Sequence, residues 1–256
     1  MHVHARVVVL RRISPGVRLG LADSLWIPAR LIARICGGLG VLNPQIAVER
    51  RSTTVRGRER AFLVYLPPGY STSRRWPVIL FLHGAGERGD DGLAPAGVGI
   101  GPALSAFSDR YPAIVVVPQC PSRRQWSDEA AYATAALDTV LDSMAADEER
   151  VSVTGISMGG HGALLMAAEA AGRFRAVAAI CGWGGDYMAE RLRNTPVWLF
   201  HGTADRIVPV EHSRALKAAF ERVGAPQFRY TEYPGVDHVS WDVAYAEPEL
   251  PPWLLG

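Results

Sequence analysis

The chain has 256 residues, of which 48% are hydrophobic and 20% are charged, an ordinary globular composition that excludes wholesale disorder. Its formal net charge of +2 is far below the basic excess of a dedicated nucleic-acid-binding protein, so we expect no nucleic-acid partner. The three cysteines are too few and too scattered for a disulfide scaffold or a zinc site, and the sequence predicts no metal site.

The first 45 residues differ from the rest of the chain, because they are basic and mix Gly, Pro and Arg with large apolar residues. Residues 28–35 are predicted as a short helix with Pro28 in its first turn, and the two glycines at 37–38 would end it. A basic amphipathic helix can lie on an anionic membrane, so weak membrane-surface contact through residues 17–42 is one alternative. Packing of this segment against the main domain is the other alternative, and we favour it.

Membrane-spanning and secretory signals are both missing from the pattern. No apolar run approaches the 18 residues that would span a membrane. The apolar run at 7–10 is too short for the core of a secretory signal, and two arginines interrupt it. We therefore expect a cytoplasmic protein.

Residues 46–256 form the second predicted unit, in which short β-branched runs alternate with helix-like stretches. Several runs are apolar on both faces, so we expect strands buried beneath helices on both sides of one sheet. Alternating strands and helices predict a mostly parallel sheet, and ligands bind such sheets beyond the carboxyl ends of the strands. The predicted strands lie at about 60–65, 77–82, 113–118, 151–154, 176–180, 197–201 and 228–233, and the predicted helices at about 129–146, 158–171, 210–223 and 240–246.

A Gly-Ile-Ser-Met-Gly sequence at residues 155–159 stands between a predicted strand and a predicted helix. This G-x-S-x-G pattern in a strand–turn–helix context is typical of a nucleophile elbow, in which a tight turn holds the serine hydroxyl clear of the sheet. The N-terminus of the following helix offers backbone N–H groups to a developing oxyanion. We therefore predict that Ser157 is a nucleophile and that the N–H of Met158 is one oxyanion donor.

A serine nucleophile needs a base and an acid that orients the base, and in this architecture they follow in the order Ser, Asp or Glu, His. Asp205 stands in the loop after the strand at 197–201, and His238 stands in the loop after the last strand. Each has a plainer interpretation: Asp205 as a cap for the helix near residue 210, and His238 as an isolated loop histidine. Their order and their shared sheet end favour a triad of Ser157, Asp205 and His238.

Other ionisable residues near these loops are predicted to have structural roles. Asp237 adjoins the triad histidine and is expected to form a turn, His161 to pack or cap within the elbow helix, and His201 to end a strand. Glu87 and the two aspartates after it carry a charge that would oppose an oxyanion, so we assign them no catalytic step.

The loop at residues 82–89, Leu-His-Gly-Ala-Gly-Glu-Arg-Gly, follows an early strand and is predicted to supply the second oxyanion donor. Gly84 and Gly86 let the backbone turn its N–H groups toward the nucleophile. We predict the N–H of Ala85 as that donor, with Gly84 or Gly86 as alternatives. Nucleotide binding is disfavoured, because the sequence contains neither G-x-x-x-x-G-K nor a G-x-G-x-x-G that opens a helix.

Four motifs carry a family resemblance: Tyr65–Tyr70, the loop at 82–89, Pro118–Pro121 with Trp126, and the elbow. From about residue 46 the chain resembles the α/β-hydrolase superfamily. Within it, the chain is similar to bacterial carboxylesterases of the feruloyl esterase and polyhydroxybutyrate-depolymerase-like group, which is related to dienelactone hydrolases. The resemblance implies an α/β-hydrolase fold, with a mostly parallel central sheet of about eight strands flanked by helices.

The same resemblance implies a strand order in which Cys120 and Cys181 follow strands about three spacings, or roughly 14 Å, apart. That separation is too large for a disulfide, so we expect free thiols. A cap in this fold is commonly inserted after the sixth strand. Only residues 181–196 separate the predicted strands there, and part of them must form a crossover helix. We therefore expect no large cap domain.

These features together predict a serine carboxylesterase that hydrolyses short-chain or aromatic carboxylic esters through an acyl-enzyme on Ser157. The expected partner is a small-molecule ester, and no metal or organic cofactor is needed. Trp126 and Trp183 are candidates for an acyl or aromatic wall. The alternatives are a thioesterase or small-peptide hydrolase on the same triad, or a non-catalytic binding protein that kept the fold.

Overall fold

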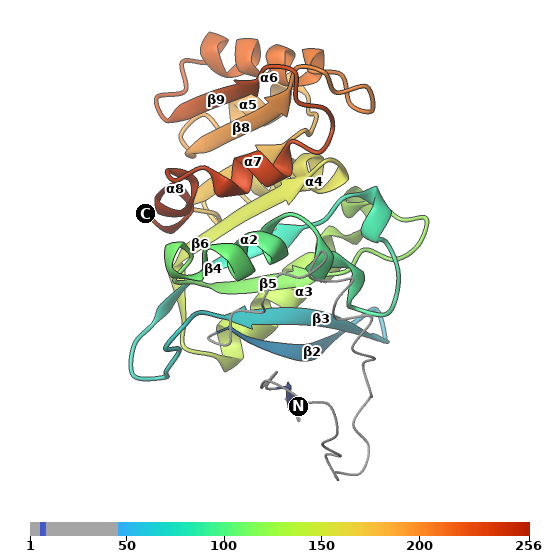
Figure 1. Ribbon diagram of the computed structural model, residues 1–256, viewed down its shortest axis with the longest axis vertical. Helices are drawn as coiled ribbons and strands as arrows, with labels where there is room; N and C mark the ends of the chain where they lie inside the picture. The colour runs from blue at the N-terminus through green and yellow to red at the C-terminus, as the bar shows by residue number, and fades with distance from the viewer. Residues whose placement is uncertain (1–5, 9–45) are drawn as a thin grey trace.

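The strands assemble into one mixed sheet in the computed structural model, which describes residues 6–8 and 46–256 (Figure 1). The strand order is β1-β2-β3-β5-β4-β6-β7-β8-β9. The pairs from β1 to β5 along this order are antiparallel, and the pairs from β5 to β9 are parallel, so the sheet is mostly parallel as predicted. The strands are β1 (Arg6–Val8), β2 (Ala47–Val55), β3 (Arg58–Leu66), β4 (Trp76–Leu82), β5 (Ile114–Pro118), β6 (Ala146–Ile156), β7 (Ala176–Ile180), β8 (Val197–Gly202) and β9 (Phe228–Tyr233).

Helices cover both faces of the sheet, and each group of helices packs on its own hydrophobic core (Figure 1). One face carries α3 (Trp126–Ser143), α4 (Met158–Glu169), α5 (Asp186–Arg191) and α6 (Glu211–Arg222). The other carries α2 (Ile100–Ala106), α7 (Trp241–Ala246) and α8 (Leu250–Leu255). The described residues also contain three short 3-10 turns: η1 (Ala85–Glu87), η2 (Ala94–Gly97) and η3 (Ser108–Arg110).

Strand β4 shows why the central runs are apolar on both faces. Val78 and Leu80 belong to the core beneath α3–α6, whereas Ile79 and Phe81 belong to the core on the opposite face. All four side chains are fully buried. Successive side chains of a strand point to opposite faces, so a strand covered on both sides alternates between two cores and shows no polar alternation.

Four of the described strands and α-helices were not predicted from the sequence: β1, β2, α2 and α8. β2 has the sequence Ala-Val-Glu-Arg-Arg-Ser-Thr-Thr-Val, whose charged residues hide the strand signal. Two of them are nevertheless buried, because Glu49 and Arg51 form an ion pair with atoms 2.8 Å apart. α2 and α8 are each shorter than two full helical turns and contain proline, so neither carries a long amphipathic repeat.

The region between β7 and β8 contains α5 and short turns, which leaves too little chain for a cap domain there. The structure thus has the mostly parallel, helix-flanked sheet that the sequence predicted, with eight strands from Ala47 onward. β1 adds a ninth strand from within the first 45 residues and pairs with β2. The domain division at residue 45 stays a prediction.

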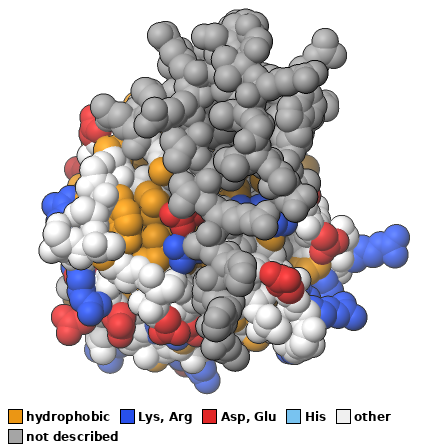
Figure 2. Space-filling view, turned by 90° about the horizontal axis from the view of Figure 1, so that it is seen from below, with side chains coloured by type: hydrophobic (Ala, Val, Ile, Leu, Met, Phe, Trp, Pro, Cys, Tyr) orange, Lys and Arg blue, Asp and Glu red, His pale blue; other side chains and the backbone are white. Residues whose placement is uncertain are grey.

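Acidic and basic side chains are interspersed around the margin of the face in Figure 2, in keeping with the small net charge. Within the described ranges, none of the helices combines the length and apolar character that a membrane crossing requires. The predicted helix at 28–35 and the membrane-contact segment at 17–42 lie outside the described residues.

Candidate active site

The turn that carries Ser157 is strained and tightly packed. β6 ends at Ile156 and α4 begins at Met158, so Ser157 alone makes the turn, with φ +51° and ψ −116°. A non-glycine residue with positive φ is costly unless the surroundings hold it in place. A Cβ at position 159 would lie 1.9 Å from the carbonyl oxygen of Leu82, so only glycine fits there. This turn is the local geometry expected of a nucleophile elbow.

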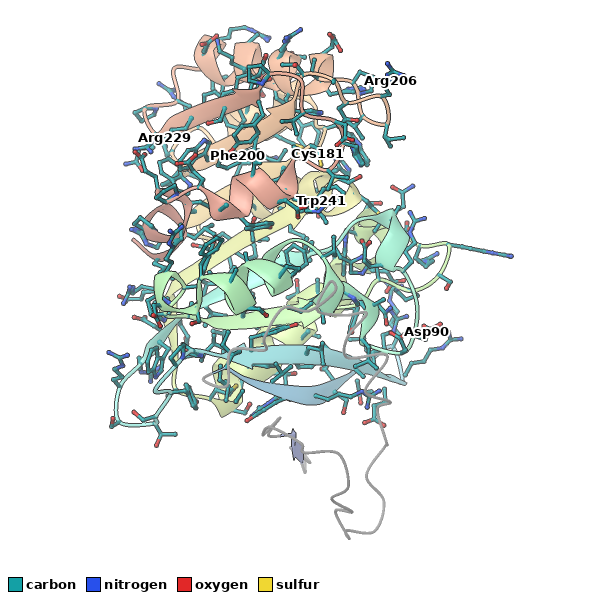
Figure 3. The ribbon with its side chains drawn as sticks, in the orientation of Figure 1. Asp90, Cys181, Phe200, Arg206, Arg229 and Trp241 are labelled. Carbon is teal, nitrogen blue, oxygen red and sulfur yellow. The ribbon has the colours of Figure 1, made fainter. Side chains whose placement is uncertain are left out.

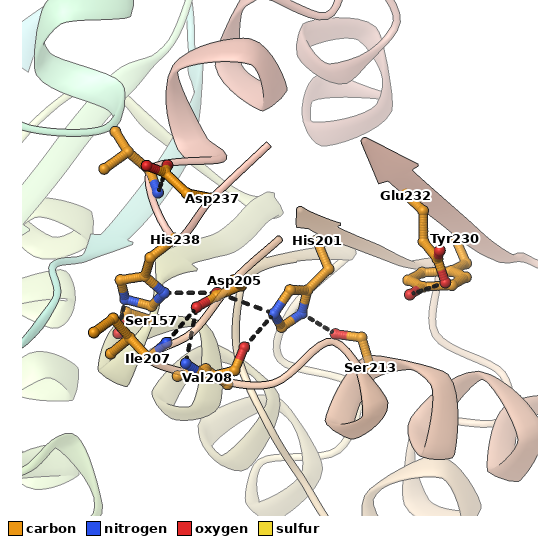
Figure 4. Close-up of polar contacts among 11 residues, drawn as sticks. Ser157, His201, Asp205, Ile207, Val208, Ser213, Tyr230, Glu232, Asp237 and His238 are labelled. Atoms are coloured by element: carbon orange, nitrogen blue, oxygen red, sulfur yellow. Dashed lines mark hydrogen bonds and ion pairs between the residues drawn. The ribbon is translucent and has the colours of Figure 1, made fainter. Parts of the chain in front are cut away.

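The structure brings Ser157, Asp205 and His238 together from three different loops (Figure 4). His238 Nε2 lies 3.0 Å from Ser157 Oγ, and His238 Nδ1 lies 2.7 Å from Asp205 Oδ2. A carboxylate can only accept, so Nδ1 carries the proton and Nε2 is free to accept the serine proton. Sequence order and strand position had predicted that these three residues would meet.

The carboxylate of Asp205 is held by donors on all sides. Oδ1 accepts the backbone N–H groups of Ile207 and Val208 at 2.8 and 2.9 Å, while Oδ2 accepts from His238. Burial by itself would raise the pKa of Asp205, but the hydrogen bonds from His238 and from the two backbone N–H groups outweigh it and lower that pKa. Asp205 therefore stays ionised and fixed in orientation at neutral pH.

A second histidine, His201, contacts Asp205 on the side away from His238 (Figure 4). Its Nε2 is 2.8 Å from the carbonyl oxygen of Val208 and 3.2 Å from Asp205 Oδ2, so this nitrogen carries a proton and donates to both. Its Nδ1 lies 2.7 Å from Ser213 Oγ, and the ring is fully buried. The sequence predicted only a strand end at His201, because a four-residue spacing that runs from a strand into a loop does not predict a distance.

The loop after β4 approaches Ser157 from the other side. A Cβ at Gly84 would lie 3.6 Å from Ser157 Cβ, which places this loop directly beside the candidate nucleophile. Ala85 is the first residue of η1 and Met158 is the first residue of α4, so neither N–H has a partner within its own helical turn. The two predicted oxyanion donors are thus the first N–H groups of two turns that meet at Ser157.

His83 and Trp126 fix this loop from beneath. His83 Nε2 accepts the backbone N–H of Cys120 at 2.8 Å, and Nδ1 lies 2.6 Å from the carbonyl oxygen of Gly84 and donates to it. Trp126 Nε1 donates to the carbonyl oxygen of His83 at 2.9 Å. Burial lowers the pKa of His83 to about 4, so the ring is neutral at physiological pH.

Trp126 corrects one expectation from the sequence. Its side chain has no exposed surface, so it cannot form a substrate wall open to solvent. Its ring instead packs edge-on against His83, with centroids 5.1 Å apart. The sequence signal, a tryptophan near the site, does not distinguish a ring that supports a loop from a ring that faces a substrate.

Three other candidate residues have the following positions. Trp183 is half-buried and stacks on His161 with centroids 4.9 Å apart, while His161 Nδ1 contacts the carbonyl oxygen of Trp183 at 2.9 Å. A substrate contact at Trp183 stays a prediction.

Asp237 Oδ1 accepts the N–H of Val239 at 3.0 Å, which is a turn contact and leaves Asp237 outside the Ser157–His238–Asp205 chain of hydrogen bonds.

Both cysteines in the described residues are free and buried, as expected; Cys36 lies outside those residues. Burial raises the pKa of Cys120 and Cys181 to about 12. The Cys181 thiol, Asp205 and His238 place potential ligand atoms within 4.8 Å of one another. These are the residues that could hold a metal, but the Asp205–His238 hydrogen bond already engages two of the atoms.

Exposed apolar side chains are found in the segments that follow the last three strands. In the part of the chain that the structure describes, the large apolar side chains that are exposed all follow β7, β8 or β9. Trp241, in one of these segments, is half-buried and packs edge-on against His238 with centroids 5.6 Å apart. The exposed side chains, called here the apolar rim, are Tyr187, Ile207, Val239 and Val243.

Comparison with known proteins places these features in a family. Residues 52–221 match the model of the family Esterase, described as "Putative esterase". Feruloyl esterase D of Neurospora crassa is 29% identical over 67% of this chain, and the chain spans only 62% of that relative's length. A solved thermostable esterase is 30% identical with a TM-score of 0.72, over 80% of this chain and 61% of the other. A ferulic acid esterase, 18% identical with a TM-score of 0.68 over 82% and 98% of the two chains, shares the fold.

Proposed function

The chain belongs to the Esterase family, and from this premise we propose that it is a serine carboxylesterase that hydrolyses small-molecule esters. The observation that carries the proposal is the continuous chain of hydrogen bonds from Ser157 through His238 to Asp205. This arrangement supports acyl transfer, because it joins a weak nucleophile to a base whose tautomer is fixed by a carboxylate.

In the first half of the proposed reaction, Ser157 Oγ attacks the ester carbonyl carbon while His238 Nε2 takes the serine proton. Asp205 holds the ring and stabilises the imidazolium that forms. The carbonyl oxygen becomes an oxyanion, which accepts hydrogen bonds from the N–H groups of Ala85 and Met158. His238 then returns the proton to the departing alcohol, and an acyl-enzyme remains on Ser157.

In the second half, a water molecule gives a proton to His238 Nε2 and attacks the acyl carbon. The bond to Ser157 Oγ breaks, the serine recovers the proton from His238, and the carboxylic acid leaves. The strained turn at Ser157 supports both halves, since it keeps Oγ exposed at the end of β6 beside the first N–H of α4.

The apolar rim supports a substrate with a short aliphatic or aromatic group. The rim is open to solvent, with Ile207 72% exposed, so it can cover only part of a long acyl chain. At about 0.8 kcal/mol for each buried methylene, binding should stop improving after roughly four to six carbons. We therefore propose short-chain or aromatic carboxylic esters as the substrate class.

A chain-length series of p-nitrophenyl esters tests this proposal. We expect activity to peak between acetate and hexanoate and to fall steeply by decanoate. Methyl ferulate tests the aromatic arm, and matched thioester and amide substrates test the thioesterase and peptide-hydrolase alternatives. Labelling of Ser157 by a fluorophosphonate tests the non-catalytic alternative. A maximum at dodecanoate would contradict an open site, and failure to hydrolyse any ester or to label Ser157 would overturn the proposed function.

A further inference from the structure

Arg88 is a half-buried arginine whose charge lacks a matching acid. It follows η1 in the loop that carries Ala85. Its Nε is buried and makes no hydrogen bond within the described residues, and one terminal nitrogen lies 3.0 Å from the sulfur of Met158. A thioether is only a weak acceptor. The guanidinium therefore retains donors that a stronger acceptor could use.

Two other arginines with limited exposure, Arg60 and Arg51, do have acidic partners. The half-buried Arg60 donates to the carboxylate of Glu129, which also accepts a hydrogen bond from the exposed Arg124. Arg51 donates to Glu49 on its own strand. These pairs follow the usual rule that a buried charge is partnered by an opposite charge. Arg88 makes no such ion pair in the described part of the chain.

The acid next to Arg88 in sequence does not supply the missing partner. The carboxylate of Glu87 lies 3.8 Å from His83 Nδ1 and accepts the backbone N–H of Gly84, so it turns into its own loop. Arg88 is thus left facing the side chain of Met158, the residue directly after Ser157. Its charge is thus not matched by a carboxylate within the loop that carries the predicted oxyanion donor Ala85.

The two sides of the site differ in chemistry. The sheet order puts the loops after β4 and β5 on one side of β6 and the loops after β7, β8 and β9 on the other. The apolar rim lies entirely on the second side, and Arg88 lies on the first. An ester with an apolar group at one end and a negative charge at the other would match both sides.

We propose that Arg88 binds a carboxylate of the substrate, so that the preferred esters carry a free carboxylate in addition to the ester bond. A planar guanidinium matches a carboxylate by two parallel hydrogen bonds, and the single charge of a carboxylate balances one arginine. This inference rests on the proposed esterase function. The carboxylate can belong to the acyl group or to the alcohol, and the experiment separates the two.

Two isosteric substrate pairs test the proposal. For the acyl side, the mono-p-nitrophenyl ester of adipic acid is compared with p-nitrophenyl 6-methylheptanoate, in which an isopropyl group replaces the carboxylate. For the alcohol side, p-acetoxybenzoate is compared with p-isopropylphenyl acetate. The measured quantity is the ratio of kcat/KM between the anionic and neutral members of each pair, after subtraction of the uncatalysed rate.

We expect the wild-type ratio to exceed unity by roughly 10- to 100-fold in one pair, the range for a hydrogen bond to a charged group. Arg88→Gln should collapse that ratio mainly through KM, and Arg88→Lys should restore part of it. Arg206→Gln is the matched control, because Arg206 is an exposed arginine in the loop after β8 and Figure 3 shows it at the same edge of the molecule as Asp90. This control should leave the ratio within about twofold of wild type.

The possible outcomes separate this inference from the proposed function. If the wild-type protein hydrolyses neutral esters through Ser157 but prefers neither anionic member, the carboxylate proposal is wrong and the esterase stands. An anionic preference that Arg88→Gln leaves intact, or that Arg206→Gln removes equally, also overturns it. If no ester is hydrolysed, the esterase proposal itself fails.

Discussion

The loop after β4 and the loop after β9 each contain a histidine at the candidate site, but the two rings have opposite surroundings. His83 is fully buried and its ring nitrogens form hydrogen bonds with backbone groups, while the Glu87 carboxylate lies 3.8 Å from Nδ1. The side chain of His238 is 18% exposed, and its nitrogens contact Ser157 and Asp205. Burial and partners therefore suit the first ring to hold a loop in place and the second to move a proton.

The difference extends to the regions around each ring. Hydrogen bonds between neutral groups, namely Trp126, the Cys120 N–H, the Gly84 carbonyl and the His83 ring, hold the loop after β4. The loops after β8 and β9 are joined by a carboxylate between two histidines. Changes in the first region should act on stability and on oxyanion geometry, whereas changes in the second should act on proton transfer.

The largest expected effect comes from substitutions in the proton-transfer region, at Ser157 and His238. Ser157→Ala and His238→Ala should each lower kcat by roughly 10³- to 10⁶-fold, because the triad acts as a unit. Neither change should lower the melting temperature by more than a few degrees, since both side chains are partly exposed. Hydrolysis of p-nitrophenyl acetate and thermal unfolding of the purified variants provide the two readouts. Activity of Ser157→Ala within tenfold of wild type would refute the assignment.

The next largest effect distinguishes Asp205 from Asp237 as the acid that orients His238. Asp205→Asn should lower kcat by roughly 10²- to 10⁴-fold, because an amide no longer fixes the required tautomer of His238. Asp237→Asn is the matched control: that carboxylate contacts the backbone N–H of Val239, so we expect less than a tenfold change. The two variants are compared on one substrate at one pH. The reverse ranking would show that Asp237 is the acid.

Much of this fold could be predicted from the sequence because buried strands and short crossovers leave strong local patterns. The predicted strand at 176–180 and the predicted helix at 158–171 correspond closely to β7 and α4. β2 escaped prediction because its buried charges, Glu49 and Arg51, neutralise each other only after the chain has folded. Local patterns report burial of apolar groups well and burial of paired charges poorly.

In the candidate site, too, some features could be predicted from the sequence and others could not. Ser157, Asp205 and His238 could be predicted to meet, because parallel strands end at one edge of the sheet. The contact of His201 with Asp205 could not, since it depends on the path of the loop between them. The burial of Trp126 could not be predicted either, because it depends on close packing against Gly162 of α4, where a Cβ would lie 2.6 Å from the Cβ of Trp126.

A smaller effect concerns the pH dependence of folding stability, to which the buried His83 contributes. The pKa of His83 falls from 6.5 to about 4 on folding, so between these values the unfolded chain binds a proton that the folded protein does not. Stability should therefore decrease as the pH falls from 6.5 to 4, by about 3 kcal/mol from this residue. Urea unfolding of wild type and His83→Asn over this range measures the effect.

His83→Asn should be less stable than wild type at pH 8 but should lose less stability on acidification, because its side chain does not titrate. His161→Gln is the control, since that half-buried ring stacks on Trp183 and lies outside the loop after β4. Parallel pH profiles for wild type and His83→Asn would mean that His83 is protonated in the folded protein, contrary to its burial.

The smallest expected effect tests whether the loop after β4 and the loops after β8 and β9 contribute independently to the free energy of unfolding. Trp126→Phe removes the donor to the buried carbonyl of His83 and should cost about 1–3 kcal/mol of stability, with a reduction of kcat of a few-fold. Trp183→Phe is the matched control, because the ring nitrogen of Trp183 makes no hydrogen bond within the described residues and an aromatic ring is kept for the stacking contact. Combined with His83→Asn, Trp126→Phe should be non-additive by more than about 0.5 kcal/mol, since the two side chains hold one loop. Combined with Asp205→Asn, it should be additive within about 0.5 kcal/mol, because the two residues share no partner. Strong coupling of Trp126 to Asp205 would mean that the loop after β4 and the loops after β8 and β9 form one cooperative unit. His83 and His238 would then differ in their chemical roles but would not belong to energetically separate regions.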